Sequence, residues 1–158
     1  MTKSEKIISE FFKPHFEKYP ELESLWFLIY DFDDGIYLAD EDCGINGHRH
    51  DDLSDDTLEE SSYKIQNAIK ILEESKVDVG NIIVELNGIV NKLQTDAWNS
   101  NPLNEILENV WGENTRAELT KKVAKSLSKE IPWKYVDWCQ CDVTRTSVSI
   151  EEFQRDSR

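Results

Sequence analysis

The sequence has 158 residues, of which 39% are hydrophobic and 10% aromatic, and this length and apolar content suit one domain with its own core. A formal net charge of −14 and an isoelectric point near 4.6 argue against direct nucleic-acid binding and against docking to anionic membranes. No segment approaches the roughly 20 apolar residues of a membrane span, and the first residues lack a signal-peptide block. We therefore expect a single globular domain over residues 1–158 in the cytoplasm.

Apolar residues at three- and four-residue spacing predict a helix close to the N-terminus. Ser4 is the expected N-cap of this helix. Pro14 lies inside the apolar pattern, and proline removes a helical hydrogen bond, so we expect a kink or a break into two short helices there.

Residues 25–32 form a short apolar and aromatic run, which predicts a strand. Asp34 and Gly35 favour a tight hairpin turn with positive φ at both positions, and residues 36–39 are expected to return as the paired strand. Residues 40–56 show no periodicity and contain glycine, which is typical of a loop.

The middle of the chain reads as a series of helices. The first is expected from about Asp56, where Thr57 and Glu60 have the spacing of a capping box. A second, containing Gly88, is expected after Asp78, with Ile82, Ile83, Leu86, Ile89, Val90 and Leu93 facing the core. Two further helices are expected from Asn101-Pro102 to Gly112 and from Asn114 to about Glu130.

The C-terminal segment is rich in aromatic and β-branched residues, which predicts strands over residues 133–141 and 143–150. The expected fold class is therefore α+β. It is a predominantly helical single domain with a small antiparallel sheet, in which the early hairpin joins the C-terminal strands.

Residues 31–60 hold twelve acidic residues and one base, Arg49, so most of the net negative charge lies in this loop-rich segment. A dense block of one charge sign is typical of an exposed face or mobile loop, and it also attracts a cationic partner. Tyr37 lies among the acids, and aromatic residues beside a polar rim are common in protein interfaces. We predict a partner-binding surface made of Asp33, Asp34, Tyr37, Asp40, Glu41, Asp42, Asp51, Asp52, Asp55, Asp56, Glu59 and Glu60.

The sequence predicts no metal site and no cofactor. Gly35 and Gly44 follow pairs of aspartates, but each falls at the fifth position of a would-be calcium loop, where the EF-hand pattern needs glycine at the sixth. Zinc would have to use ligands whose spacing does not match the usual short Cys pairs. Those residues are Cys43, His48, His50, Cys139 and Cys141, and the cysteines are expected to be buried.

The sequence offers no motif for catalysis, and we do not expect an enzyme. It contains no Gly-x-Ser-x-Gly nucleophile elbow and no glycine-rich phosphate loop. Its carboxylates crowd one hydrophilic segment, whereas paired catalytic carboxylates need different environments. An active site assembled from residues far apart in the sequence stays open as an alternative.

The acid run, which includes Asp40-Glu41-Asp42, Asp51-Asp52 and Asp55-Asp56, resembles in general build the small acidic immunity proteins of bacterial toxin–immunity systems. The resemblance implies a protein that binds and neutralises a basic toxin domain, such as a nuclease, by electrostatic complementarity.

Two other binding roles stay open. The acids could imitate duplex phosphate in a DNA-mimic inhibitor, although a mimic needs charges spaced along a rigid surface. The protein could also be an acidic secretion or assembly chaperone with an apolar groove. We expect no direct contact with nucleic acid or membrane.

Overall fold

The computed structural model describes residues 1–154. They form five α-helices and a five-stranded antiparallel sheet, which confirms the predicted α+β class. The described residues divide into two compact units: residues 1–50 with 106–154 form unit 1, and residues 51–105 form unit 2. The expectation of one domain over the whole chain stays a prediction. Within the described part of the chain, no helix combines the length and apolarity that a membrane span requires.

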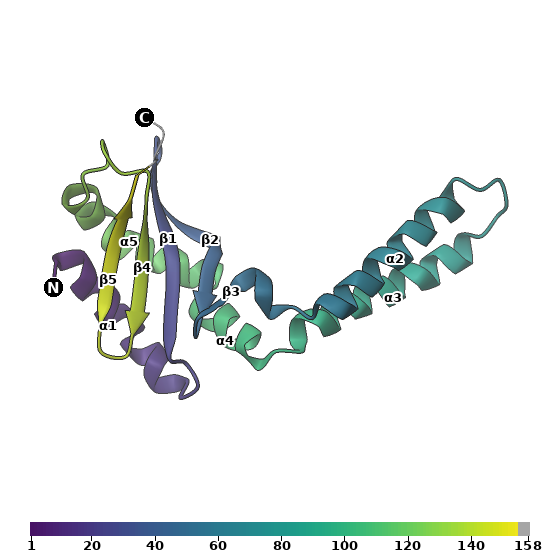
Figure 1. Ribbon diagram of the computed structural model, residues 1–158, viewed down its shortest axis with the longest axis horizontal. Helices are drawn as coiled ribbons and strands as arrows, with labels where there is room; N and C mark the ends of the chain where they lie inside the picture. Colours follow the sequence, from purple (N-terminus) through teal and green to yellow (C-terminus); the bar gives the residue numbers. More distant parts are fainter. Residues whose placement is uncertain (155–158) are drawn as a thin grey trace. The chain divides into compact units, whose positions relative to one another are not determined.

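The sheet belongs to unit 1 and has the strand order β3-β2-β1-β4-β5. Its strands are β1 (Ser24–Phe32), β2 (Gly35–Ile45), β3 (His48–Arg49), β4 (Trp138–Thr144) and β5 (Val148–Phe153). All neighbouring pairs are antiparallel. The N-terminal hairpin therefore joins the C-terminal strands through β1 and β4, as the sequence predicts (Figure 1).

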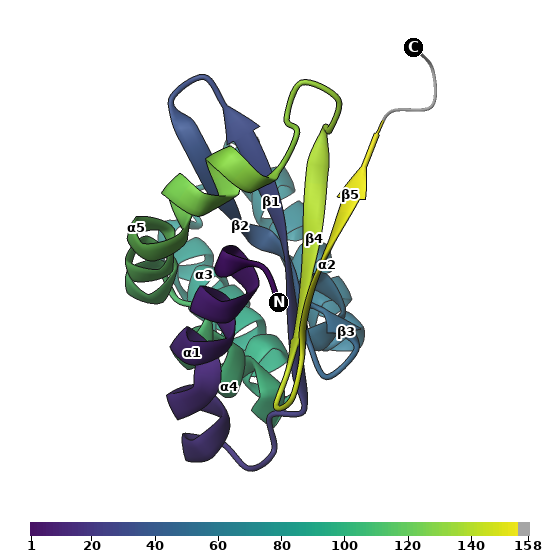
Figure 2. The ribbon, with the colours of Figure 1, turned by 90° about the vertical axis from the view of Figure 1, so that its left-hand side faces the viewer.

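Helices cover one face of this sheet. α1 (Lys3–Lys18) and α5 (Glu113–Glu130) pack against each other and against the strands (Figure 2). Leu25, Phe27 and Ile29 of β1 are buried beneath them. Because side chains alternate along a strand, the even-numbered residues of β1 point to the opposite face, where Figure 2 shows no helix of the described part of unit 1.

The core under the helices is organised around Trp111, which follows α4 (Pro102–Val110). The rings of Trp111 and Phe27 stack with centroids 4.2 Å apart, and Phe12 of α1 lies 6.0 Å from Trp111. The buried indole Nε1–H donates a hydrogen bond to the carbonyl oxygen of Ala39 at 2.8 Å. This bond ties the middle of β2 to the helical layer and leaves no unpaired polar atom on the indole.

α1 differs from the prediction at its N-cap and at Pro14. Its N-cap is Thr2, whose Oγ1 accepts from the Glu5 backbone N–H at 3.1 Å while the Glu5 carboxylate accepts from the Thr2 backbone N–H. Of the kink or break expected at Pro14, the break is wrong, since the helix continues through this residue. Phe12 and Phe16 are buried on either side of the exposed Pro14, so packing of both helix halves against the same core outweighs the lost hydrogen bond.

Ser4, predicted as the N-cap, lies instead in a buried junction between α1 and the end of α5. Its Oγ lies 2.7 Å from Ser126 Oγ and donates to the Glu130 carboxylate, which also accepts from the Ser4 backbone N–H at 3.2 Å. Burial alone would raise the pKa of Glu130, but the hydrogen bonds from Ser4 hold that pKa below its usual value. The carboxylate thus takes up an unpaired N–H group of the first turn of α1.

The hairpin turn is shifted by one residue from its predicted place. Asp33 and Asp34 form the two-residue loop, and Gly35, with φ 127°, pairs with Phe32 as the first residue of β2. Among the described non-glycine residues only Asn46 has positive φ, so Asp34 does not have the conformation that was expected. Glycine is needed at position 35 because other residues rarely adopt this φ.

The loop predicted from residue 40 is wrong for its first part, because β2 continues to Ile45. Phe27 pairs with Cys43 and Leu25 with Ile45, so the first half of β1 holds the end of this stretch as a strand, while residues 40–42 lie at a shift in register. The register of β1 and β2 shifts at Leu28, and this irregularity interrupts the alternation of apolar and polar residues that would have predicted a strand here. The C-terminal strands are also shifted, since β4 runs to Thr144, across the predicted gap at residue 142.

Arg145 lies in the turn between β4 and β5 and binds the end of α1. Its guanidinium donates to four backbone carbonyls, those of Phe16 at 2.7 Å, Tyr19 at 3.1 Å, Pro20 at 3.0 Å and Leu22 at 2.8 Å. The last carbonyls of a helix have no partner within the helix and carry partial negative charge. One cationic side chain therefore satisfies the segment that leads from α1 into β1.

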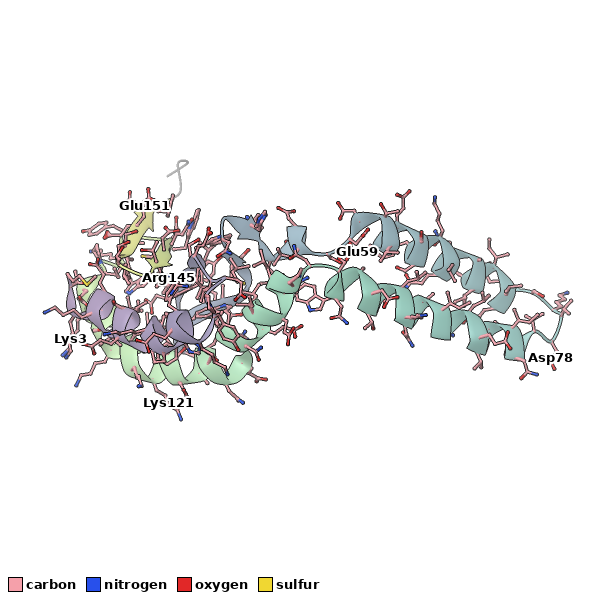
Figure 3. All side chains as sticks on the ribbon, turned by 90° about the horizontal axis from the view of Figure 1, so that it is seen from below. Lys3, Glu59, Asp78, Lys121, Arg145 and Glu151 are labelled. Atoms are coloured by element: carbon pink, nitrogen blue, oxygen red, sulfur yellow. The ribbon has the colours of Figure 1, made fainter. Side chains whose placement is uncertain are left out.

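Unit 2 is a helical hairpin of α2 (Asp56–Glu73) and α3 (Gly80–Asn99), with Asp78 in the turn between them (Figure 3). A short 3-10 helix, His50–Leu53, leads into α2. Ile69 and Val90 are buried between the helices. Two residues predicted to face a core, Ile82 and Ile89, are instead about half exposed, because a pair of helices buries only one stripe of each.

Replacing Arg145 with alanine leaves the carbonyls at the end of α1 without their donor. We expect the free energy of unfolding to fall by about 2 kcal/mol, measured by urea denaturation. Arg145→Lys should recover only part of the loss, since an ammonium group cannot reach four carbonyls in the geometry of a guanidinium. A lysine variant as stable as the wild type would contradict this role.

Glu130 should make stability depend on pH in the acidic range. Because its pKa is lowered on folding, the stabilisation is present above the usual carboxyl pKa and is lost as the pH falls through the lowered value. Glu130→Gln should therefore destabilise the protein near neutral pH and flatten the fall in stability between about pH 5 and pH 3. Thermal unfolding across this range, with Glu151→Gln on β5 as the control, measures the effect.

Candidate functional site

The predicted partner-binding residues fall into two groups, one in each unit. Unit 1 carries Asp33, Asp34, Tyr37, Asp40, Glu41 and Asp42 on the β1–β2 hairpin, and unit 2 carries Asp51, Asp52, Asp55, Asp56, Glu59 and Glu60 before and within α2. Within each unit these residues lie on consecutive elements of the chain, and each group is a candidate surface of its own unit.

Three aromatic rings form a cluster at the hairpin end. The rings of Tyr30 and Phe32 stack with centroids 5.5 Å apart, and Tyr37 lies 5.6 Å from Phe32 and 6.3 Å from Tyr30. Tyr30 and Tyr37 are cross-strand partners, so their side chains share the face of the sheet that α1 and α5 leave open. Phe32 is 53% exposed and Tyr37 40% exposed, which places apolar surface in water at the tip of the hairpin.

The two tyrosines hold two of the acids in place. The Tyr37 hydroxyl donates to Asp40 Oδ1 at 2.9 Å, and the Tyr30 hydroxyl donates to Asp42 Oδ2 at 3.1 Å. The hydrogen bond from Tyr37 lowers the pKa of Asp40, and the same bond raises the pKa of Tyr37. Asp40 is therefore ionised and oriented, with its charge close to an exposed ring.

Asp42 also contacts the only base of the acidic segment. Its Oδ1 lies 3.7 Å from the Arg49 guanidinium, which is 5.7 Å from the ring centre of Trp26. Gly44 makes this arrangement possible, because a Cβ at that position would lie 2.1 Å from Nε1 of Trp26. The Trp26 indole thus lies directly over the backbone of β2 at the base of the acidic strand.

A hollow of about 450 Å³ lies beside these residues, between β2 and α5. Tyr37 and Asp40 line it from the strand, and Arg116 lines it from the helix. The Arg116 guanidinium donates to the carbonyl of Trp111 at 2.6 Å, and its charge also lowers the pKa of Asp40. The hollow combines fixed charge with apolar walls from Ile36 and Leu38, a composition suited to a protruding side chain of a partner.

In unit 2 part of the acidic group has a structural role. Asp55 is the N-cap of α2, and its Oδ1 accepts from the backbone N–H groups of Thr57 at 2.9 Å and Leu58 at 3.1 Å. The predicted capping box of Thr57 and Glu60 is wrong, because Asp55 and not Thr57 is the N-cap. Glu60 instead pairs with Lys64 at 3.6 Å, one turn further on. Asp56 and Glu59 lie in the first turn of α2, where the helix dipole favours acidic side chains.

The predicted partner-binding residues include neither Phe32 nor Trp26. The signal that would have found them is the alternation of β1, in which the residues between the buried Leu25, Phe27 and Ile29 are only partly covered. The same open face carries a second aromatic pair, Trp138 of β4 stacked on Phe153 of β5 with centroids 5.7 Å apart.

The cysteines are buried, as predicted. Burial raises the pKa of Cys139 to about 12 and also raises that of Cys141 well above its usual value. Both thiols therefore stay protonated in the apolar interior. Within residues 1–154, no group of three or more His, Cys, Asp or Glu side chains is arranged to hold a metal ion.

The sequence matches no protein-family model, and comparison with curated proteins and with solved structures finds no significant match. The residues of the site and their geometry are accordingly the basis for assigning a function.

Tyr37→Phe removes the hydroxyl that donates to Asp40 and keeps the ring. We expect the pKa of Asp40 to rise toward its usual value, because the hydrogen bond that favours the charged form is lost. Carboxyl chemical shifts followed by NMR through an acid titration measure the change. Tyr135→Phe, which removes an exposed hydroxyl from the segment between α5 and β4, is the control, and an unshifted Asp40 in the Tyr37 variant would contradict the assignment.

Proposed function

We propose that this protein captures a basic protein partner through the acidic and aromatic hairpin end of unit 1. We further propose that it is an immunity protein, which neutralises a cognate toxin domain in the cytoplasm of the cell that makes it. The observation that carries the proposal is the cluster of exposed Phe32 and Tyr37 with the oriented carboxylates of Asp40 and Asp42.

The two kinds of residue support different steps of binding. Carboxylates gathered on one surface speed the encounter with a cationic domain and fix its orientation. Exposed aromatic rings supply the apolar contact that holds a complex together, and their faces also accept Lys and Arg side chains. A nuclease that binds phosphate with a cationic cleft is the class of toxin that this surface complements.

The aromatic cluster favours this role over a DNA mimic. A mimic needs acids in regular rows with little between them, whereas here rings and carboxylates alternate on a short hairpin. The hydrogen bonds from the two tyrosines also reduce the reorganisation that the carboxylates need on binding.

The test is to capture the partner from the native host and measure its kinetics against hairpin variants. Changing Asp33, Asp34, Asp40 and Glu41 to the matching amides should lower the association rate constant by about tenfold at low salt. Phe32→Ala should mainly raise the dissociation rate constant, by about tenfold or more. Both effects are measured by surface plasmon resonance over a series of salt concentrations.

Two variants serve as controls. Glu151→Gln with Glu152→Gln removes exposed acids from β5 and should leave binding unchanged. Asp51→Asn with Asp52→Asn and Asp56→Asn tests the acids of unit 2, with Asp55 retained because it caps α2. If the hairpin variants bind as the wild type does, or if only the unit 2 variant loses binding, the proposed surface is wrong.

A further inference from the structure

The outer surface of α3 differs from the rest of this highly charged protein. Only three of its 20 residues, Glu85, Lys92 and Asp96, carry charge, whereas eight of the 18 residues of α5 do. Large apolar residues also lie in solvent on this helix: Val84 is 71% exposed and Ile89 48% exposed. A helix with apolar residues around its circumference is usually buried on more than one side.

Gly88 has no explanation within the chain. It lies in the middle of α3 with helical backbone, and the glycines with positive φ in the described residues are Gly35 and Gly47. A Cβ at position 88 would meet no atom within 4 Å. Glycine inside a helix costs about 1 kcal/mol relative to alanine, so the chain loses stability here without gaining a contact of its own. Another helix passing close to the backbone would account for it.

We propose that α3 packs antiparallel against α3 of a second copy of this chain, with Gly88 at the crossing point and Val84 and Ile89 beside it. Residues 85, 88 and 92 lie on one stripe of the helix by their spacing of three and four. Val84 and Ile89 lie on either side of that stripe, so both can contact the second helix.

The charges on this stripe are self-complementary. Glu85 comes three residues before Gly88, and Lys92 comes four residues after it. Antiparallel packing about a two-fold axis at Gly88 places Glu85 of each copy opposite Lys92 of the other. The contact thus contains two Glu85–Lys92 ion pairs, one on each side of an apolar centre.

The net charge of the protein explains why a second copy would meet here. Two molecules with a formal charge of −14 repel each other over most approaches, and the acids of the hairpin end would face acids. α3 carries a net charge of only −1 and has exposed apolar residues, so a second copy meets less repulsion here than at the acidic surfaces. This inference does not depend on the proposed function of unit 1.

The test is the mass of the full chain in solution, measured by sedimentation equilibrium over a range of protein concentrations. We expect the wild type to form dimers. Gly88→Leu should raise the dissociation constant by at least about tenfold through steric overlap at the crossing, while raising the unfolding temperature of the monomer. Opposite changes in dimerisation and monomer stability distinguish an interface glycine from a structural one.

A charge exchange provides the second measurement. Glu85→Lys should weaken the dimer, and combining it with Lys92→Glu should restore it, because the pairs re-form with reversed sign. Tyr63→Lys, at an exposed aromatic of α2, is the matched control and should leave the dimer intact. A monomeric wild type, a dimer unaffected by Gly88→Leu, or a charge exchange that fails to restore association would each overturn the proposal.

Discussion

The structure of unit 1 depends on the alternation of side chains along β1, the central strand of the sheet. Leu25, Phe27 and Ile29 point toward α1 and α5, and they pack with Trp111 in the main aromatic core. The alternate residues, including Trp26 and Tyr30, must then point to the face of the sheet that α1 and α5 leave open. The candidate site follows from this constraint, because its rings occupy the positions that the core cannot use.

The same strand also determines how the acidic stretch is presented. Cross-strand pairing with β1 holds residues 35–38 and 43–45 of β2, and Asp40, Glu41 and Asp42 lie at the register shift between these two paired segments. The Tyr30 hydroxyl donates a hydrogen bond to Asp42, and the Tyr37 hydroxyl donates one to Asp40, so side chains of the paired segments hold two of these acids in place. Strand pairing on either side of these acids, and the core beneath the sheet, therefore offset the repulsion between their charges.

The proposed capture of a basic partner uses unit 1, whereas the proposed contact with a second copy uses unit 2. Unit 1 presents exposed aromatic rings among carboxylates, a combination suited to a cationic protein. Unit 2 presents a helix with few charges, exposed apolar residues and an unexplained glycine, a combination suited to another copy. The acids at the start of α2 contribute to the net charge, but Asp55 also has the separate task of capping the helix.

Much of the fold was determined by short-range patterns in the sequence. The apolar spacing of the helices, the strand at residues 25–32 and the alternation near Val148 depend on periodicity and propensity, and the α+β class follows from them. The concentration of acids in residues 31–60 is likewise a property of the sequence alone. Only the tertiary structure decided that α1 runs through Pro14, that residues 40–45 are a strand, and that Phe32 and Trp26 lie outside the core. Each of these depends on contacts between segments far apart in the chain, and such contacts outweigh local preferences that amount to only about 1–3 kcal/mol.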